Sequence, residues 1–268
     1  MKADPILVCW VDGAIAPADQ AVVRADDSAF NEGRGCYTSV RIAGGQPRFA
    51  DRHVVRLQHG AQALRLGKID ETTIRCALTE LAAAALPAGE GVVRLQVSRD
   101  SEGTTHLVGV ARCLGEDPPE WSAITVTQCH DGASISEGRK ITSRLTLALA
   151  GEDARKAGVN EAVLLDSSGH LVEGARSNLF VAPPGGSIWT PPIASGAVAG
   201  IARTISIERL PEIEERAISR SELLAAAELI AVNAVRGARA ITRLDGCTVG
   251  DGGGGPWCGR FAEVLAAD

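Results

Sequence analysis

Lysine side chains are scarce in this sequence, which narrows the search for a reactive amine. The four lysines are Lys2, Lys68, Lys140 and Lys156. Lys2 lies near the terminus, Lys68 follows a glycine in an expected loop, and Lys156 lies at the charged end of an expected helix. An amine condenses with an aldehyde when part of it is unprotonated, and desolvation or neighbouring cations increase that part by lowering the pKa. Lys140 is therefore the candidate for amine chemistry, and a surface Arg139–Lys140 pair is the plain alternative.

Polar residues follow Lys140 in a definite order. After a helical segment that ends at Gly158, the pattern predicts a strand, a turn at Asp166-Ser167-Ser168-Gly169, and a second strand that carries both Glu173 and Asn178. Asn178 completes the run Glu173-Gly174-Ala175-Arg176-Ser177-Asn178. A glutamate beside a glycine at a strand end is, on its own, typical of a solvated surface. The order of lysine, Asp-x-x-Gly and Glu-Gly-x-x-x-Asn is long and specific, which indicates that these residues serve one function together.

This order resembles the core signature of the fold-type IV pyridoxal-phosphate (PLP) enzymes, which include branched-chain and D-amino-acid transaminases and 4-amino-4-deoxychorismate lyase. The resemblance implies that Lys140 forms a Schiff base with PLP and that Glu173 keeps the pyridine nitrogen protonated. Asn178 would lie near the 3′-oxygen side of the cofactor. The resemblance also implies an α+β protein of two domains, with the cofactor at the domain interface, that forms a homodimer.

The phosphate of PLP needs a bidentate donor and oriented backbone amides. The sequence Arg52-His53-Val54-Val55-Arg56-Leu57 resembles the family's His-x-x-Arg-Leu, whose arginine binds phosphate, and this assigns the role to Arg56. Arg52, one turn earlier, is the competing assignment.

Two further segments resemble phosphate-side elements of the family. At Gly200-Ile201-Ala202-Arg203 the family often has Gly-Ile-Thr-Arg, so Ala202 lacks the threonine hydroxyl. The backbone amides of Ile201 and Ala202 can still serve, and Gly200 lets the backbone approach. Val198 would pack against one ring face. The pair Asn233-Ala234 resembles the Asn-Ala of the lyase.

The residues after a glycine-rich stretch bear on which PLP reaction is catalysed. Branched-chain transaminases usually carry Phe-Glu-Gly-x-Arg there, and D-amino-acid transaminases Tyr-Glu-x-x-Arg. Here the sequence Gly33-Arg34-Gly35-Cys36-Tyr37-Thr38-Ser39-Val40-Arg41 has Thr38 at the glutamate position, close to the lyase's Gly-x-Gly-Cys-Phe-Thr-Thr-x-Arg. The resemblance therefore implies aminodeoxychorismate lyase activity in folate precursor synthesis, with Lys140 as base and Thr38 as a hydrogen-bond partner in the leaving or protonation step. An ordinary β-branched strand residue is the other interpretation of Thr38.

The substrate residues and the reaction leave alternatives open. Candidates for substrate contacts are Tyr37, Arg94 and Arg176, with Arg99 and Arg236 as further candidates for its carboxylates. Arg176 stands where relatives carry small residues, so it either narrows the pocket or points outward. A transaminase of the same fold, acting on branched-chain or D-amino acids, is the alternative function. A non-catalytic relative would be expected to have lost Lys140 or Glu173, and both are present.

Apolar periodicity predicts the elements that position these groups. Val54, Leu57, Ala61 and Leu64 recur at helical spacing, and a second helix from Glu71 to Leu86 would be capped by Asp70. Three segments alternate as strands do, at 36–42, 92–98 and 106–113. The expected strands are mainly antiparallel, and the lack of regular strand–helix alternation argues against a Rossmann sheet.

The charged, proline-containing segment 116–120 is the expected linker between two domains. It would separate a smaller N-terminal α/β domain (1–115) from a larger C-terminal PLP-binding domain (121–268).

Composition and charge exclude several classes of protein. The chain has 268 residues, a net charge of −6 and a pI near 5.5, so it lacks the broad basic face of a nucleic-acid-binding protein. Neither a secretory leader nor an apolar stretch long enough to span a bilayer is evident. The odd number of cysteines favours reduced thiols, and the histidines lack metal-ligand spacing. We therefore expect a cytoplasmic enzyme with a small-molecule substrate and no metal, nucleic-acid or membrane partner.

Overall fold

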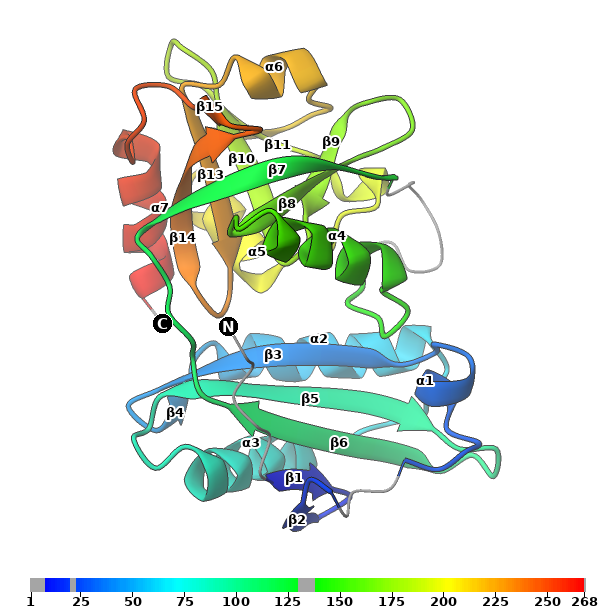
Figure 1. Ribbon diagram of the computed structural model, residues 1–268. Helices are drawn as coiled ribbons and strands as arrows, with labels where there is room; N and C mark the ends of the chain where they lie inside the picture. Colours follow the sequence, from blue (N-terminus) through cyan, green and yellow to red (C-terminus); the bar gives the residue numbers. More distant parts are fainter. Residues whose placement is uncertain (1–7, 20–22, 130–137, 268) are drawn as a thin grey trace. The chain divides into compact units, whose positions relative to one another are not determined.

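The computed structural model describes residues 8–19, 23–129 and 138–267, and the chain divides into two compact units (Figure 1). Unit 1 comprises Met1–Glu116 together with Arg139–Ser143, and unit 2 comprises Asp117–Gly138 together with Arg144–Asp268. The first boundary lies inside the segment 116–120 that the sequence suggested as a linker. The difference is at residues 139–143, which the expected domain 121–268 includes and which pack in unit 1 instead.

Asp117 explains why the chain joins unit 2 before the proline-containing segment ends. Its carboxylate accepts hydrogen bonds from Trp121 Nε1 at 3.1 Å and from Arg239 Nε at 3.0 Å. Trp121 is itself buried in the core of unit 2. These two hydrogen bonds therefore hold Asp117 in unit 2.

An antiparallel six-stranded sheet forms the frame of unit 1, with the order β2-β1-β6-β5-β3-β4. The strands are Val8–Val11 (β1), Ala14–Pro17 (β2), Cys36–Ala43 (β3), Gln46–Pro47 (β4), Gly91–Arg99 (β5) and Thr105–Arg112 (β6). The strands predicted at 36–42, 92–98 and 106–113 are thus confirmed, with ends that shift by a residue or so. In the β3–β5 ladder, Tyr37 lies opposite Gln96 and Ser39 opposite Arg94.

The helices of unit 1 are α1 (Ser28–Asn31), α2 (Ala50–Ala63) and α3 (Glu71–Ala85). α2 and α3 lie on one face of the sheet (Figure 1), where Leu57 and Leu78 join the core that contains Val40 of β3. α3 begins where it was predicted to begin, because the Asp70 carboxylate accepts a hydrogen bond from Thr73 N at 3.2 Å.

Unit 2 contains a nine-stranded mixed sheet with the order β12-β11-β10-β13-β14-β7-β8-β9, and β15 pairs with β14. The strands are Glu120–Cys129 (β7), Glu161–Leu165 (β8), Leu171–Gly174 (β9), Asn178–Ala182 (β10), Ile188–Thr190 (β11), Ile213–Glu215 (β12), Glu228–Asn233 (β13), Gly237–Leu244 (β14) and Cys247–Thr248 (β15). Most neighbouring strands are antiparallel, as predicted, but β7 is parallel to both β8 and β14, and β11 is parallel to β12. The β7–β8 connection contains a helix, as a parallel pair requires a crossover.

The helices of unit 2 are α4 (Leu145–Lys156), α5 (Ile201–Arg209), α6 (Arg220–Leu224) and α7 (Pro256–Ala266), with a short 3₁₀ helix at Ile193–Ser195. Gly158 follows α4 with φ 71°, the left-handed conformation expected of a glycine after a helix. Phe180 of β10 packs against Phe261 of α7, whereas its neighbour Leu179 joins a core that includes Leu223 of α6. Within the described ranges, no helix has both the length and the apolar character needed to cross a bilayer.

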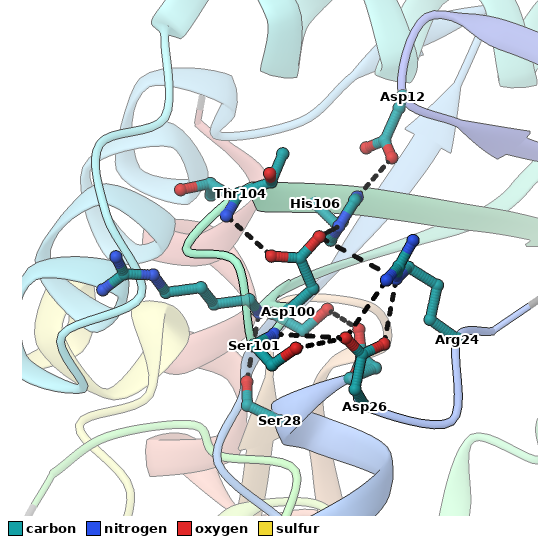
Figure 2. A network of polar contacts seen from close by, with 12 residues as sticks. Asp12, Arg24, Asp26, Ser28, Asp100, Ser101, Thr104 and His106 are labelled. Atoms are coloured by element: carbon teal, nitrogen blue, oxygen red, sulfur yellow. Dashed lines mark hydrogen bonds and ion pairs between the residues drawn. The ribbon is translucent and has the colours of Figure 1, made fainter.

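A polar network in unit 1 joins the β1–β2 turn to the β5–β6 turn (Figure 2). His106 of β6 contacts Asp12 Oδ2 through Nδ1 at 2.6 Å and Asp100 Oδ2 through Nε2 at 3.1 Å. Arg24 lies 3.8 Å from the Asp100 carboxylate and pairs with Asp26 at 2.9 Å. Burial by itself would lower the pKa of His106, but the hydrogen bonds and charges of Asp12 and Asp100 outweigh it and raise the pKa. The folded state therefore favours the protonated form of His106, in which both ring nitrogens can donate to the two carboxylates.

We predict that His106 stabilises unit 1 more strongly at mildly acidic than at alkaline pH. Its pKa is raised in the folded protein, so the stabilisation is fully present below the unfolded pKa and is lost as the pH rises through the folded pKa. Urea unfolding of the wild type and of His106→Gln, at about pH 5.5 and about pH 9 on either side of the usual histidine range, measures the effect. The difference in free energy of unfolding should be larger at the lower pH, and an equal difference at both would contradict the prediction.

Candidate active site

The segment that carries Lys140 pairs with the start of β3. Tyr37 N donates a hydrogen bond to Lys140 O at 2.9 Å, and Cys36 forms a β-bridge with Ile141. Thr142 extends the pairing, since its amide donates to Gly35 O at 2.9 Å. These backbone contacts fix the position of Lys140 next to Tyr37 within unit 1.

Glycines make this close approach possible. A Cβ atom on Gly35 would lie 2.7 Å from the Cβ of Ala29 and 3.0 Å from the side chain of Thr142, which is too close for any other residue. Gly33 has φ 66°, and its carbonyl oxygen accepts a hydrogen bond from the Thr142 hydroxyl at 2.7 Å. The glycine-rich stretch before β3 therefore serves the backbone geometry around Lys140.

Two cations lie over the ring of Tyr37. Lys140 Nζ is 4.9 Å and Arg94 Cζ 3.8 Å from the ring centroid. Arg94 is the diagonal neighbour of Tyr37 on the same face of the β3–β5 ladder, since Gln96 is directly opposite. A cation within about 6 Å of an aromatic centroid is attracted by the ring's quadrupole. The amine of Lys140, the guanidinium of Arg94 and the phenol of Tyr37 therefore lie close together. The sequence had selected all three residues as candidates.

Thr38 points to the opposite face of β3, because successive residues of a strand alternate. Its Oγ1 lies 2.5 Å from His53 Nδ1, and Thr38 and His53 are 0% and 1% exposed. Burial, and then the charges of Arg56 and Lys140, lower the pKa of His53 to about 3, so the imidazole is neutral near pH 7. The Thr38 hydroxyl therefore joins β3 to α2, and the expected contact with substrate has no support in this geometry.

Arg56 lies one turn after His53 on α2. Burial lowers the pKa of its guanidinium to about 10, against an opposing contribution from Tyr37, so Arg56 remains a cation near pH 7. A guanidinium withdrawn from water in this way suits an anion such as phosphate. His53 was missed in the sequence, where it counted as one of several scattered histidines. Its position in His-x-x-Arg, which places it on the same helix face as Arg56, was the available signal.

In unit 2 the Glu173 carboxylate lies at the end of β9 and is 3% exposed. Glu173 Oε2 accepts a hydrogen bond from Val198 N at 3.0 Å, and Asn178 Nδ2 lies 3.4 Å from the same oxygen. Asn178 Nδ2 also donates to Val198 O at 2.8 Å. Three residues that the sequence selected are therefore in contact, and side chains from β9 and β10 hold both backbone groups of Val198. Glu173 and Asn178 lie on these two strands and not on one strand as predicted, because the chain turns at 174–177, where Gly174 N donates to Ser177 O.

The N-terminus of α5 has the features of an anion site. Gly200 is its N-cap and no side chain caps it. Within the described part of the chain, the buried amides of Ile201 and Ala202 have no hydrogen-bond acceptor. A Cβ atom on Gly200 would lie 2.0 Å from Asn178 Oδ1, so a side chain there would displace Asn178. Unpaired amides and the helix dipole both favour a bound phosphate.

Asn233 and Ala234 lie where β13 ends. Asn233 Oδ1 accepts hydrogen bonds from Val235 N at 3.0 Å and from Arg236 N at 2.8 Å. The side-chain oxygen thus shapes the turn after the strand, as asparagine commonly does. A contact between this turn and phosphate stays a prediction.

Arg176 answers one question that the sequence left open. Its side chain is exposed, donates to Asn160 O and lies over the Trp121 ring, 5.3 Å from the centroid. Arg176 therefore points outward, and the expected contact with substrate is not supported. Two other candidates are also engaged in contacts of their own, Arg99 with Arg65 O at 3.3 Å and Arg236 with the Asp117 carboxylate at 3.4 Å.

Each unit contains groups of the kind that PLP needs. In unit 1, Arg56 is a cation suited to a phosphate, and Lys140 carries an amine suited to an aldehyde. In unit 2, the N-terminus of α5 offers amides to a phosphate, and Glu173 offers a buried carboxylate to a protonated pyridine nitrogen. Among the described residues, no group of three or more His, Cys, Asp and Glu side chains is placed to hold a metal ion.

We predict that Thr38→Val lowers stability more than it lowers turnover. The substitution leaves His53 Nδ1 without its partner in a buried site, and such a loss typically costs about 1–3 kcal/mol. Urea unfolding should show this cost, and Thr38→Ser, which keeps the hydroxyl, should recover most of it. A Thr38→Val protein with wild-type stability and a strongly reduced kcat would show instead that the hydroxyl takes part in the chemistry.

Comparisons with known proteins show which family the chain resembles. The model of the family described as amino-transferase class IV matches residues 35–244. The chain is 25% identical over 260 residues to a D-alanine aminotransferase of Bacillus licheniformis, and the aligned region covers 91% of each sequence. It is 28% identical over 196 residues to a bifunctional aminodeoxychorismate lyase / D-amino acid transaminase of Mycobacterium tuberculosis, and the aligned region covers 67% of each sequence.

A solved structure extends the likeness to the fold. The 4-amino-4-deoxychorismate lyase of Pseudomonas aeruginosa matches with a TM-score of 0.83 at 25% identity, over 97% of this chain and 98% of that chain. The predicted α+β fold of the fold-type IV enzymes is thereby confirmed. With a family model that spans residues 35–244, the chain belongs to the class IV aminotransferase family.

Proposed function

We propose that this chain is a PLP-dependent lyase that converts 4-amino-4-deoxychorismate to 4-aminobenzoate and pyruvate. The observation that carries the proposal is the placement of Lys140 Nζ and Arg94 Cζ at 4.9 Å and 3.8 Å from the centroid of the Tyr37 ring. The substrate is an unsaturated ring that bears an amine and carboxylates. An aromatic side chain suits the ring, a guanidinium suits a carboxylate, and the lysine amine lies beside both.

The stretch before and within β3 supports a lyase over a transaminase. Its sequence from Gly33 to Arg41 is close to the lyase pattern and has Thr38 where the transaminase patterns have glutamate. Because the Thr38 side chain is bonded to His53, we assign it a structural role in this lyase and not a catalytic one.

Residues of both units serve the cofactor in this proposal. Arg56 and the amides of Ile201 and Ala202 would bind the phosphate, and Glu173 would keep the pyridine nitrogen protonated while Asn178 orients its carboxylate. When bound, PLP supplies an aldehyde that condenses with an amine and a ring that accepts electrons.

Lys140 carries out the proton transfer. Its Nζ takes the proton from C4 of the substrate, the C3–O bond to the enolpyruvyl group breaks, and the remaining ring becomes aromatic. The departing enolpyruvate gains a proton from the lysine ammonium at its methylene carbon and so becomes pyruvate. The two products together contain all atoms of the substrate, so the reaction consumes no oxidant. The hydrogen bond from Tyr37 N to Lys140 O holds the lysine backbone, and Arg94 orients a substrate carboxylate.

A transaminase of D-amino or branched-chain amino acids is the second candidate. The likeness to a D-alanine aminotransferase over 91% of the chain favours it. In a transaminase Lys140 would still move the proton, but the product would be a keto acid. The same groups around Tyr37 would then bind the carboxylate of a smaller amino acid.

We also propose that the working form is a homodimer in the cytoplasm. All six cysteines whose side chains the structure describes are free thiols, which agrees with a reducing compartment. Light scattering of the purified protein measures the mass of the assembly.

We predict that the purified protein, supplied with PLP, forms 4-aminobenzoate and pyruvate from enzymatically generated 4-amino-4-deoxychorismate. Lys140→Ala should lose at least about 100-fold in kcat, because general acid–base catalysis typically contributes that much or more. Absence of 4-aminobenzoate, together with keto-acid release from D-alanine or L-leucine, would contradict the lyase and establish the transaminase.

We predict that Arg94→Gln raises KM for 4-amino-4-deoxychorismate by roughly 10- to 100-fold, because one charge-assisted hydrogen bond to a carboxylate is lost. Arg99→Gln is the matched control, since it removes an arginine of the same strand whose guanidinium donates to Arg65 O. An unchanged KM in Arg94→Gln, or an equal rise in both variants, would show that Arg94 does not bind the substrate.

A further inference from the structure

Glu161 is a buried carboxyl group to which the proposed reaction assigns no task. It is the first residue of β8 and is 1% exposed. Ser177 Oγ donates a hydrogen bond to Glu161 Oε2 at 2.6 Å, and Ala162 N donates to Glu161 Oε1 at 3.0 Å. Both carboxyl oxygens are thus used inside the protein, so this group does more than fill space.

The partner of Glu161 belongs to the turn between β9 and β10. In this turn Gly174 N donates to Ser177 O at 2.8 Å, and Ala175 N donates to Ala162 O at 3.0 Å. The turn also packs directly on the carboxyl group. A Cβ atom on Gly174 would lie 2.5 Å from Ser177 Oγ and 3.0 Å from Glu161 Oε2. Glu161 therefore sets both the position of Ser177 and the approach of Gly174.

The two ends of this turn carry the groups that the cofactor needs. Glu173 directly precedes Gly174, and Asn178 directly follows Ser177. The distance of 3.4 Å between Asn178 Nδ2 and Glu173 Oε2 depends on how the turn between them is held. A shift of the turn would also move the 3.0 Å contact between Val198 N and Glu173 Oε2.

We propose that Glu161 is a positioning residue, which holds the turn 174–177 so that Glu173 and Asn178 present their side chains correctly to the pyridine side of PLP. This inference rests on the proposed role of Glu173. Glu161 itself would not contact the cofactor and would act through the Ser177 hydroxyl.

The energetics agree with a role in orientation. Burial raises the pKa of Glu161, while the Ser177 hydroxyl, the Arg176 charge and nearby amides act in the opposite direction. A buried carboxyl group whose partners are removed would be left with unsatisfied oxygens. The folded state therefore favours the arrangement of the turn in which both carboxyl oxygens of Glu161 are hydrogen-bonded.

Two variants test this inference with readouts that do not depend on turnover. Glu161→Gln keeps the volume but loses one acceptor, and Ser177→Ala removes the hydroxyl with little change in shape. We expect each to raise the Kd for PLP by about five- to tenfold, the size of effect expected when one hydrogen bond is lost. The nitrogen signal of bound PLP labelled with ¹⁵N in its pyridine ring should also shift toward the unprotonated form.

Ser219→Ala is the matched control. It removes a serine hydroxyl that also bonds a glutamate of unit 2, in the capping box that Ser219 forms with Glu222 at the start of α6. We expect it to lower the melting temperature and to leave the Kd and the nitrogen signal unchanged. If Glu161→Gln does not fold, Ser177→Ala alone provides the test.

The outcomes separate this inference from the proposal beneath it. Glu173→Gln should change both readouts, and if it changes neither, the assignment of Glu173 fails and the inference fails with it. If Glu173→Gln changes both but Glu161→Gln and Ser177→Ala leave them at wild-type values, the positioning role alone is overturned. An equal change in Ser219→Ala would also overturn it, because general loss of stability would then account for the effect.

Discussion

The pairing of residues 139–143 with the start of β3 is the constraint on which the rest of the structure depends. A lysine side chain has a flexible four-carbon stem, so its amine can be directed only if the backbone is fixed. The hydrogen bond from Tyr37 N to Lys140 O and the bridge from Cys36 to Ile141 fix it, and the Tyr37 ring then offers the amine a cation–π contact. To make these contacts the chain leaves unit 2 for a few residues and then returns to it.

In unit 2 a functional side chain, the Glu173 carboxylate, must also be held in place, and hydrogen bonds to the side chain do this instead of pairing of the backbone. A carboxylate buried at the end of a strand is costly unless donors surround it, and Val198 N and Asn178 Nδ2 both approach Glu173 Oε2. Glu161 repeats the arrangement one strand away, with the Ser177 hydroxyl as its donor. Gly200 completes this part of the unit, because only a residue without a side chain leaves room for Asn178 before the free amides of α5. In both units glycines permit the approaches and hydrogen bonds fix the polar groups.

Much of this could be predicted from the sequence, and the failures have identifiable physical reasons. The Asp70 cap, the helix after it and the three long strands of unit 1 follow from local patterns, and these were predicted correctly. Thr38, Val40 and Ile42 alternate along β3 and so lie on one face of the strand, and the two apolar residues indicated that this face is buried. Thr38 was nevertheless assigned to the chemistry, because the assignment followed the resemblance of the motif. No local pattern could place residues 139–143 in unit 1, because their partners lie about a hundred residues earlier in the chain and contacts between such distant positions leave no periodic signal. The outward direction of Arg176 depends on Asn160 and Trp121, whose contacts with it leave no periodic signal either.

The central claim is that the amine of Lys140, fixed beside Tyr37, is the group that reacts with the aldehyde of PLP. Incubation of the protein with PLP, reduction with borohydride and peptide mass spectrometry measure this most directly. The account predicts a pyridoxyl phosphate group on the peptide that contains Lys140, and none on the peptides that contain Lys68 or Lys156. A protein that binds PLP but carries the reduced group on another lysine, or on none, would contradict it.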